Sequence, residues 1–594
     1  MLKSALAALR LTHLSLALVG LMWVFPFLHV SHAYPLTTFY QEWWSALLGV
    51  LAITLLLERD YWVDPAIPRV AQLPVALIAV LVVQWLLGKI VYFDQALLYA
   101  LYLLLAALLM LLGARLRDRI GLPKLTQALA IALLIGAELS ALIGVMQHFG
   151  WHTPLDSVIV VKMSAVIYGN LAQPNHFASY IALGLISLGL VWQQKLVKPG
   201  YIALLALPML FVMALSGSRS SWLYLLLMVA MAWWWSHRDA SLKPLLRYSL
   251  LLIAGFGLMH LVAQLQVVAT ETGSINTVGR LLNNQETGDI RLYLWHEAGL
   301  MFMHFPILGA GFGQFATQHF QLLPELKQSN ILGLYNNAHN LIFQLVAETG
   351  AIGLLILFAS LGVWVNAVRR VNHTVEHWWG YAILGVLAIH SLLEYPLWYS
   401  YFLAIAAVLL GMFDETHYRF KWRLAGRVSL ASLWLLGLWL LLQLMSGYQY
   451  LERAVAASTP ATGGAQTASI NVREALTSLH HVPLLTPYAE LFMSDHMAVD
   501  AQYINEKLAL NTRVTSFVPI SPVVYRQALL LAQGGQLEQA KTIWRQALWS
   551  YPESRQHQQE KLAALAAKDP AHFSGLLEFA LQKEQERTRA IFHQ

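Results

Sequence analysis

The sequence predicts an all-α fold: a polytopic membrane bundle of about 12–13 transmembrane helices, with a large outer loop and a soluble helical C-terminal domain. Of the 594 residues, 58% are hydrophobic and only 12% are charged, about half the charged fraction of a soluble domain. Apolar stretches of about 20 residues, the length that crosses a bilayer, recur along the chain. Beyond residue 447 these stretches stop and charged residues become frequent.

We predict thirteen membrane spans in order along the chain. They cover 11–28, 44–57, 72–88, 95–112, 125–147, 174–193, 201–216, 220–235, 248–267, 338–365, 378–393, 396–412 and 428–446. The pairs within 201–235 and 378–412 are tight hairpins, so a count of twelve stays open. Ser31-His32-Ala33 also fits a signal-peptide cleavage site, but we expect the first span to be retained.

Positive charge distinguishes the two sides of the predicted bundle. With the N-terminus in the cytoplasm, the inner segments hold nineteen Lys and Arg residues, and the short outer loops hold three. This asymmetry follows the positive-inside rule. The long loop 268–337 and the tail 447–594 then face the outside, which is the periplasm in a bacterium. We therefore expect a multi-pass protein of the bacterial inner membrane.

Several chemistries are disfavoured by composition and spacing. The chain has no cysteine, which excludes disulfides, thiolate metal sites and a Cys nucleophile. His296-Glu297 is followed by Leu300 where a zincin has its second histidine. Gly309-x-Gly311-x-Gly313 follows no predicted strand, which disfavours a nucleotide loop. The net charge of +6 is spread over loops. We expect no metal, no cofactor and no nucleic-acid partner.

The two segments predicted to lie outside the membrane have helical patterns of their own. Residues 289–304 have one apolar face and predict a helix lying on the membrane surface. The domain 447–594 is predicted to be a periplasmic helical domain. Residues 522–550 predict one helical hairpin of the tetratricopeptide kind.

His339 is the central candidate residue. It lies at the N-terminus of the tenth predicted span, where polar groups are costly and usually serve a site. The positive end of a helix favours a neutral imidazole, which can accept a proton. A lone histidine is more often structural, but Asn337 and Asn340 flank it and favour catalysis. In the same span Asn340, Gln344 and Glu348 recur every fourth residue, and helix–helix hydrogen bonding explains this stripe as well as function does.

Three arginines on the predicted outer side depart from the charge rule. They are Arg219, Arg280 and Arg291. Guanidinium groups bind phosphate through two oxygens, so we expect an anionic ligand near His339. Pairing with lipid head groups or with Asp289 is the alternative.

Two further polar clusters lie at predicted outer helix ends. Gln173, Asn175 and His176 stand where the sixth span begins. Helix capping alone needs one of them, so three favour a binding site. Glu394 and Tyr395 lie between the eleventh and twelfth spans and could face the same cavity, although alone they indicate only an aromatic interface.

Together these motifs resemble the O-antigen ligase (Wzy) superfamily, and within it the bacterial O-linked protein oligosaccharyltransferases of the PglL type. The resemblance covers roughly residues 165–412. It rests on Ala172-Gln173-Pro174-Asn175-His176-Phe177-Ala178, Ser218-Arg219-Ser220, Arg291-x-x-x-Trp295, Pro306-x-x-Gly309-x-Gly311, Asn337-Ala338-His339-Asn340 and Glu394-Tyr395-Pro396, in this order around a large outer loop.

The resemblance implies a transmembrane glycosyltransferase domain over 1–446. Such an enzyme transfers a preassembled glycan from undecaprenyl pyrophosphate to a Ser or Thr hydroxyl of a pilin or other periplasmic protein, without metal or nucleotide. We expect inversion at the anomeric carbon by a single displacement.

Carried onto this sequence, the resemblance assigns roles to individual residues. Arg219 and Arg291 would hold the pyrophosphate, and Arg280 is a weaker candidate. His339 would be the essential histidine near the acceptor hydroxyl, acting as base or positioning group. Gln173 and Tyr395 would be functional polar residues of the protein-glycosylating branch.

Three other functions stay open at this point. The chain could be an O-antigen ligase acting on lipid A-core, an O-antigen polymerase, or a flippase for lipid-linked oligosaccharides. The Gln-Pro-Asn-His segment and the outer tail favour a protein acceptor. The sequence has none of the internal repeats that are common in transporters.

Overall fold

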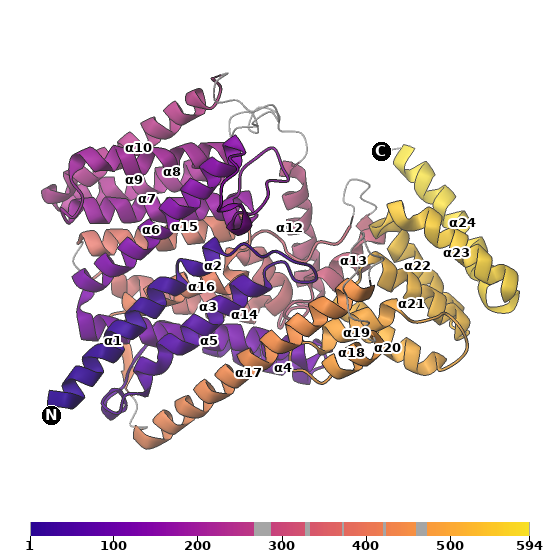
Figure 1. Cartoon of the computed structure of the whole chain (residues 1–594). Coiled ribbons are helices and arrows are strands. Elements are labelled where there is room, and N and C mark those ends of the chain that lie inside the picture. Colours follow the sequence, from indigo (N-terminus) through magenta and orange to yellow (C-terminus); the bar gives the residue numbers. More distant parts are fainter. Residues whose placement is uncertain are drawn as a thin grey trace.

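The computed structural model describes residues 2–265, 287–326, 333–370, 374–419, 423–458 and 472–592. This part of the chain is almost entirely helical (Figure 1). Within it a small antiparallel sheet pairs β1 (Ala66–Pro68) with β2 (His417–Arg419). The predicted all-α class is confirmed.

Each of the thirteen predicted spans coincides with a helix. These helices are α1 (Leu2–Met22) with α2 (Phe25–Leu28), α3 (Phe39–Ala52), α4 (Gln72–Leu86), α5 (Phe93–Ile120), α6 (Leu122–Phe149), α7 (Pro174–Gln193), α8 (Pro199–Leu215), α9 (Ser220–Arg238), α10 (Lys243–Val262), α14 (Leu341–Val368), α15 (Val375–Leu393), α16 (Ser400–Met412) and α17 (Arg423–Ser458). Short 3-10 helices are η1 (Ile53–Leu57), η2 (Tyr61–Val63), η3 (Arg69–Ala71), η4 (Asp156–Val158), η5 (Gly169–Leu171), η6 (Ala240–Leu242), η7 (Pro396–Trp398) and η8 (Pro552–Ser554).

Among the described residues, nine helical segments are long and apolar enough to cross a membrane. They are α1–α2, α3–η1, η3–α4, α5, α6, α7, η6–α10, α14 and α17, while α8 and α16 are apolar but shorter. The chain is a multi-pass membrane protein.

Helix α7 lies at the centre of the bundle. In its most apolar stretch 89% of the residues are buried by other helices, against 17% for α17 at the periphery. Phe177 and Tyr180 are fully buried there, and Trp378 and Trp379 of α15 are fully buried as well. The N-terminus of α7, which carries the predicted polar cluster, is therefore surrounded by other helices of the bundle.

Helix α14 is broken at Gly350, whose φ is +64°. The loop that begins at Pro306 docks on the break, because the Ala351 amide donates to the Pro306 carbonyl at 2.9 Å. Gly309 has a φ of +67°, and a Cβ there would lie 2.2 Å from the carbonyl carbon of Glu348. The Pro-x-x-Gly-x-Gly motif thus provides a backbone that approaches a broken membrane helix closely and satisfies its exposed peptide groups.

The described parts of the 268–337 segment form α12 (Thr287–His304) and α13 (Phe315–Leu326). The predicted helix at 289–304 is confirmed. Its apolar face, with Leu294, Ala298 and Met301 fully buried, packs against residues of α13 and α14. The face that we predicted to lie on the membrane is therefore largely covered by other helices of the protein. An amphipathic pattern predicts that a helix has an apolar face, but it does not predict whether lipid or protein covers that face.

The C-terminal region is a separate group of helices at the end of the molecule opposite the N-terminus (Figure 1). It comprises α18 (Val472–Leu479), α19 (Thr486–Asp495), α20 (Ile504–Phe517), α21 (Ser521–Gln533), α22 (Leu537–Ser550), α23 (Arg555–Lys568) and α24 (Pro570–Phe592). The hairpin predicted at 522–550 is present as α21 and α22.

Glu490 of α19 attaches this region to the membrane bundle. Its carboxylate accepts hydrogen bonds from the Tyr92 hydroxyl, next to α5, and from Arg513 at 2.7 Å. His480 lies 3.0 Å from the same carboxylate. Burial would raise the pKa of Glu490, but these hydrogen bonds and the Arg513 charge hold it below its usual value. The carboxylate is therefore ionised at neutral pH and anchors the C-terminal helices.

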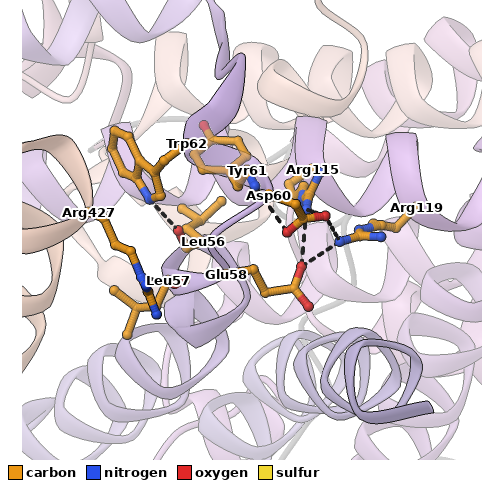
Figure 2. A network of polar contacts seen from close by, with 9 residues as sticks. All are labelled: Leu56, Leu57, Glu58, Asp60, Tyr61, Trp62, Arg115, Arg119 and Arg427. Atoms are coloured by element: carbon orange, nitrogen blue, oxygen red, sulfur yellow. Dashed lines mark hydrogen bonds and ion pairs between the residues drawn. The ribbon is translucent and has the colours of Figure 1, made fainter. Parts of the chain in front are cut away.

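A second charged cluster follows η1 (Figure 2). Glu58 pairs with Arg115 at 3.0 Å and with Arg119 at 2.7 Å, and both arginines also pair with Asp60. Arg427 donates to the Leu57 carbonyl at 2.9 Å. These contacts tie the segment after η1 to the C-terminal end of α5 and to the start of α17.

Candidate functional site

Glu394 gathers side chains from three distant segments. It ends α15, where the following Tyr-Pro pair stops the helix. Its Oε1 accepts hydrogen bonds from Arg291 of α12 at 2.7 Å and from Asn175 of α7 at 3.0 Å. Its Oε2 lies 2.7 Å from Nδ1 of His339. One carboxylate thus brings together four residues that the sequence singled out separately.

The carboxylate lies deeper than the guanidinium and imidazole groups that contact it. The Glu394 side chain is 8% exposed, whereas Arg291 is 33% and His339 is 26% exposed. Burial would raise the pKa of Glu394, but the hydrogen bond from His339 and the positive charge of Arg291 outweigh it and place the pKa below its usual value. The carboxylate is ionised at neutral pH, and both partners stay accessible from the surface.

The turn that carries His339 is held by the asparagines on either side. His339 has a φ of +51°, a left-handed conformation that is uncommon outside glycine. The Asn337 side chain accepts from the His339 amide at 2.7 Å. Asn340 caps α14 by accepting from two backbone amides at 2.9 and 3.2 Å, and it donates to the Leu392 carbonyl at 2.9 Å. The predicted position of His339 at the mouth of a membrane helix is confirmed.

The imidazole of His339 is oriented from two sides. Because Nδ1 faces an ionised carboxylate, Nδ1 carries the hydrogen, and Nε2 is the nitrogen that can accept a proton. The Tyr395 ring stands edge-on to the imidazole, with centroids 5.1 Å apart. A histidine held in this way by a carboxylate has the geometry of a general base with its orienting partner.

Trp295 links the helix that carries Arg291 to the turn that carries His339. It lies four residues after Arg291 and therefore on the same face of α12. Its indole donates to the Ala338 carbonyl at 3.0 Å and stacks on Phe343 at 5.1 Å. This contact explains the spacing of the Arg-x-x-x-Trp motif.

The cluster continues from Asn175 to the segment before α9. Ser218 donates from its hydroxyl to Oδ1 of Asn175 at 2.8 Å. Arg219 follows directly and is half-buried at the start of α9. The Ser-Arg-Ser segment is therefore connected to Glu394 through one amide side chain.

Gln173 and His176 have internal contacts in the structure. Gln173 caps α7 by accepting from the His176 amide at 2.6 Å. The His176 ring is 3% exposed and lies edge-on to Tyr399 at 4.8 Å and to His390 at 5.2 Å. Of the three polar residues in this segment, Asn175 is the one that reaches Glu394, and the binding roles of the other two stay predictions.

The polar stripe on α14 supports the turn above it. Gln344 accepts from the Ala338 amide at 2.7 Å and donates to Glu348 at 2.9 Å. Glu348 also accepts from the Phe315 amide at 3.4 Å. These contacts favour the packing explanation of the stripe.

Ser218 and Trp295 stood within sequence motifs without a predicted function, and Glu394 was not predicted to be the common partner. The i, i+4 spacing of Arg291 and Trp295 was the available signal. The predicted anion-binding residue Arg280 lies outside the described residues.

Three family models match the chain. "Protein glycosylation ligase" matches residues 167–192, "O-Antigen ligase" matches 203–358, and "Virulence factor membrane-bound polymerase, C-terminal" matches 378–565. A General O-oligosaccharyltransferase of Acinetobacter baylyi is 28% identical over 445 residues, which cover 73% of this chain and 75% of that protein. The chain is similar to the O-antigen ligases, and these matches support an oligosaccharyltransferase enzyme.

A second relative, the ComP-specific O-oligosaccharyltransferase of the same organism, is 23% identical over 382 residues, which cover 63% of this chain and 66% of that protein. The names of both relatives support O-linked protein glycosylation. Each of the three matched segments contributes a residue to the cluster around Glu394 of this oligosaccharyltransferase.

Proposed function

We propose that this oligosaccharyltransferase transfers a preassembled glycan from undecaprenyl pyrophosphate to a Ser or Thr hydroxyl of a pilin or other periplasmic protein. The observation that carries the proposal is the shared contact of Glu394 with Arg291 and His339, both at 2.7 Å. A cation that suits pyrophosphate and a base that suits a hydroxyl are thereby held side by side at the surface.

Arg291 and Arg219 bind the pyrophosphate in this proposal. Departure of the lipid pyrophosphate develops negative charge, and guanidinium groups stabilise it through paired hydrogen bonds. A guanidinium has five N–H donors, and the structure assigns one nitrogen of Arg291, Nη2, to Glu394. The other N–H groups of Arg291 can then bind the pyrophosphate of the lipid-linked glycan while Nη2 keeps its contact with Glu394.

His339 activates the acceptor. Its Nε2 takes the proton of the Ser or Thr hydroxyl while the oxygen attacks the anomeric carbon. The bond from that carbon to the pyrophosphate oxygen breaks, and the lipid pyrophosphate leaves with the bonding electrons. Glu394 stabilises the imidazolium that forms. One displacement from the face opposite the leaving group inverts the anomeric configuration.

The remaining predicted residues support binding in this scheme. Asn337 and Asn340 hold the His339 turn, and Tyr395 borders the imidazole. The proposed orientation places this site and the domain 447–594 on the periplasmic side of the bacterial inner membrane. The name of the ComP-specific relative motivates a pilin-like acceptor as the first to test.

Intact mass measurement tests the proposal. Purified protein, lipid-linked glycan and a pilin-like acceptor should increase the acceptor mass by one glycan. His339→Ala and Arg291→Ala should abolish that increase while the protein stays folded. The matched controls His237→Ala and Arg238→Ala, at the exposed far end of α9, should keep full transfer. Normal transfer by either site variant would refute the assigned function of that residue.

A lipid acceptor is the second candidate, because one matching family model is named for O-antigen ligases. Replacing the protein acceptor with lipid A-core separates the two. Transfer of the glycan to lipid A-core but not to the protein would refute protein glycosylation and would make the enzyme an O-antigen ligase. Movement of the donor across vesicles without any transfer would favour a flippase.

A further inference from the structure

The two segments that carry the reacting side chains meet on the C-terminal domain. Tyr293 lies two residues after Arg291, and Tyr335 lies four residues before His339. Both tyrosines pack against the same apolar pair, Leu323 of α13 and Trp549 of α22, which are 1% and 9% exposed. Trp549 belongs to the C-terminal domain, although Arg291 and His339 belong to the segments beside the membrane.

Backbone and side-chain hydrogen bonds reinforce this contact. The Gly333 amide donates to the Ser550 carbonyl at 2.8 Å, directly beside Trp549. The Thr317 hydroxyl donates to the Ser516 carbonyl at 3.1 Å. Phe320 of α13 is 2% exposed within the apolar core of the C-terminal domain. The chain that leads to His339 is therefore attached to α22 before it reaches the membrane helix α14.

A buried pair beside Tyr335 connects α12 to α13. Nδ1 of His319 lies 2.7 Å from Glu297, and both side chains are at most 1% exposed. The Tyr335 ring stands edge-on to the His319 ring at 5.5 Å. A displacement of Tyr335 or Tyr293 is thus transmitted through packed groups that have little room to relax.

We propose that Trp549 is a positioning residue for glycan transfer: its indole braces Tyr293 and Tyr335, and so fixes the Arg291 guanidinium relative to the His339 imidazole. This inference rests on the proposed function of those two residues. Trp549 offers little surface to an acceptor because it is 9% exposed and Arg587 lies over its ring at 5.4 Å. Its effect on transfer comes through geometry, and misplacement of a reacting group by about 1 Å can cost about 10²-fold in rate.

Steady-state kinetics of the full chain distinguish bracing from acceptor docking. Trp549→Ala should lower kcat about 10- to 100-fold and leave the acceptor KM nearly unchanged. Trp549→Phe keeps an apolar ring and should restore most of the rate. The control Trp544→Phe alters the same residue type on the same helix, where the ring packs on Tyr525 inside the domain, and should turn over normally. An increase in KM at constant kcat would overturn the proposal, and so would wild-type kinetics of Trp549→Ala.

Amide hydrogen exchange tests the brace without using activity. In Trp549→Ala, exchange should accelerate at 333–340 and 287–300 and stay unchanged in α15 and α21. Should that variant unfold, Tyr335→Leu removes the contact from the opposite side and should show the same pattern. Unchanged exchange at 333–340 would overturn the brace even in an active enzyme. Conversely, a wild-type protein that transfers no glycan would refute the proposed function. The exchange measurement would still show whether Trp549 holds the segments of Arg291 and His339 in place.

Discussion

The cluster around Glu58 and the cluster around Glu394 lie at opposite ends of the bundle and are built differently. Helix α16 connects them, because it starts six residues after Glu394 and its last carbonyl, that of Met412, accepts from Arg117 at 3.1 Å. At the Arg117 end, two carboxylates, Glu58 and Asp60, face two guanidinium groups (Figure 2). At the other end, one carboxylate, Glu394, faces a guanidinium, an imidazole and an amide.

This difference separates a structural cluster from the proposed reactive site. The cluster around Glu58 contains equal numbers of carboxylates and guanidinium groups, so their charges balance within the protein. Around Glu394 a single buried carboxylate supports two partners that stay about one-quarter to one-third exposed. The second arrangement places a guanidinium that suits an anion beside an imidazole that suits a hydroxyl, whereas the first contains only ion pairs.

The largest expected effect follows from removing the charge of Glu394. Glu394→Gln keeps the shape of the side chain but no longer orients both partners. Transfer should fall about 10²- to 10⁴-fold, as it does when a catalytic histidine loses its carboxylate partner. Initial rates with saturating donor measure this. Glu58→Gln at the opposite end is the comparison and should change the rate by less than about 2-fold. Equal losses in both variants would erase the distinction between the clusters.

A smaller loss is expected one contact further from the reaction. Ser218→Ala removes the hydroxyl that donates to Asn175 at 2.8 Å. A hydrogen bond of this kind is worth about 1 kcal/mol, which corresponds to about 5-fold in rate. The same kinetic assay measures it. The control is Ser236→Ala, a serine near the far end of α9 that bonds only within its own helix turn, and it should leave the rate unchanged.

The pH dependence of stability should also separate Glu394 from a neutral side chain. Because the folded-state pKa of Glu394 lies below its usual value of 4.5, its ionised form stabilises the fold fully above pH 4.5. That contribution is lost as the pH falls through the lower folded-state value. The thermal midpoints of wild type and Glu394→Gln should therefore differ by a constant amount above pH 4.5, and this difference should shrink in stronger acid. A difference that grows on acidification would contradict the assigned ion pairs.

The smallest effect is expected at the opposite cluster. Arg119→Gln removes one of two guanidinium groups that share Glu58 and Asp60, and Arg115 still pairs with both carboxylates. Unfolding should become easier by at most about 1 kcal/mol, with no change in transfer. Thermal unfolding and the transfer assay, run together, measure both. A large loss of transfer would give this end of the molecule a function that its balanced charges do not suggest.

The sequence predicted the membrane helices well because their signal is local. Runs of apolar residues alone place α4 or α7 to within a few residues of the observed helices. The break in α14 at Gly350 left no such signal, because the run continues through it. What makes that break tolerable is the loop from Pro306, and this contact depends on the tertiary structure.

The candidate site was predicted in pieces. His339, Arg291 and Asn175 were each identified by polarity or charge at a predicted helix end. Glu394 was predicted only as a residue that could face the same cavity, although it is the residue that joins them. A buried carboxylate next to a Tyr-Pro turn looks like an ordinary helix end until its three partners, each distant in sequence, are seen to converge. The contact between Trp549 and the two tyrosines likewise has no sequence pattern.

The central claim is that Glu394 and His339 act as one unit in glycan transfer. The most direct measurement is the transfer rate of His339→Ala, Glu394→Gln and the double variant, with lipid-linked glycan and a protein acceptor. If the carboxylate works through the imidazole, the double variant should be no slower than His339→Ala alone. Losses that multiply in the double variant, or a wild-type rate for His339→Ala, would contradict the account.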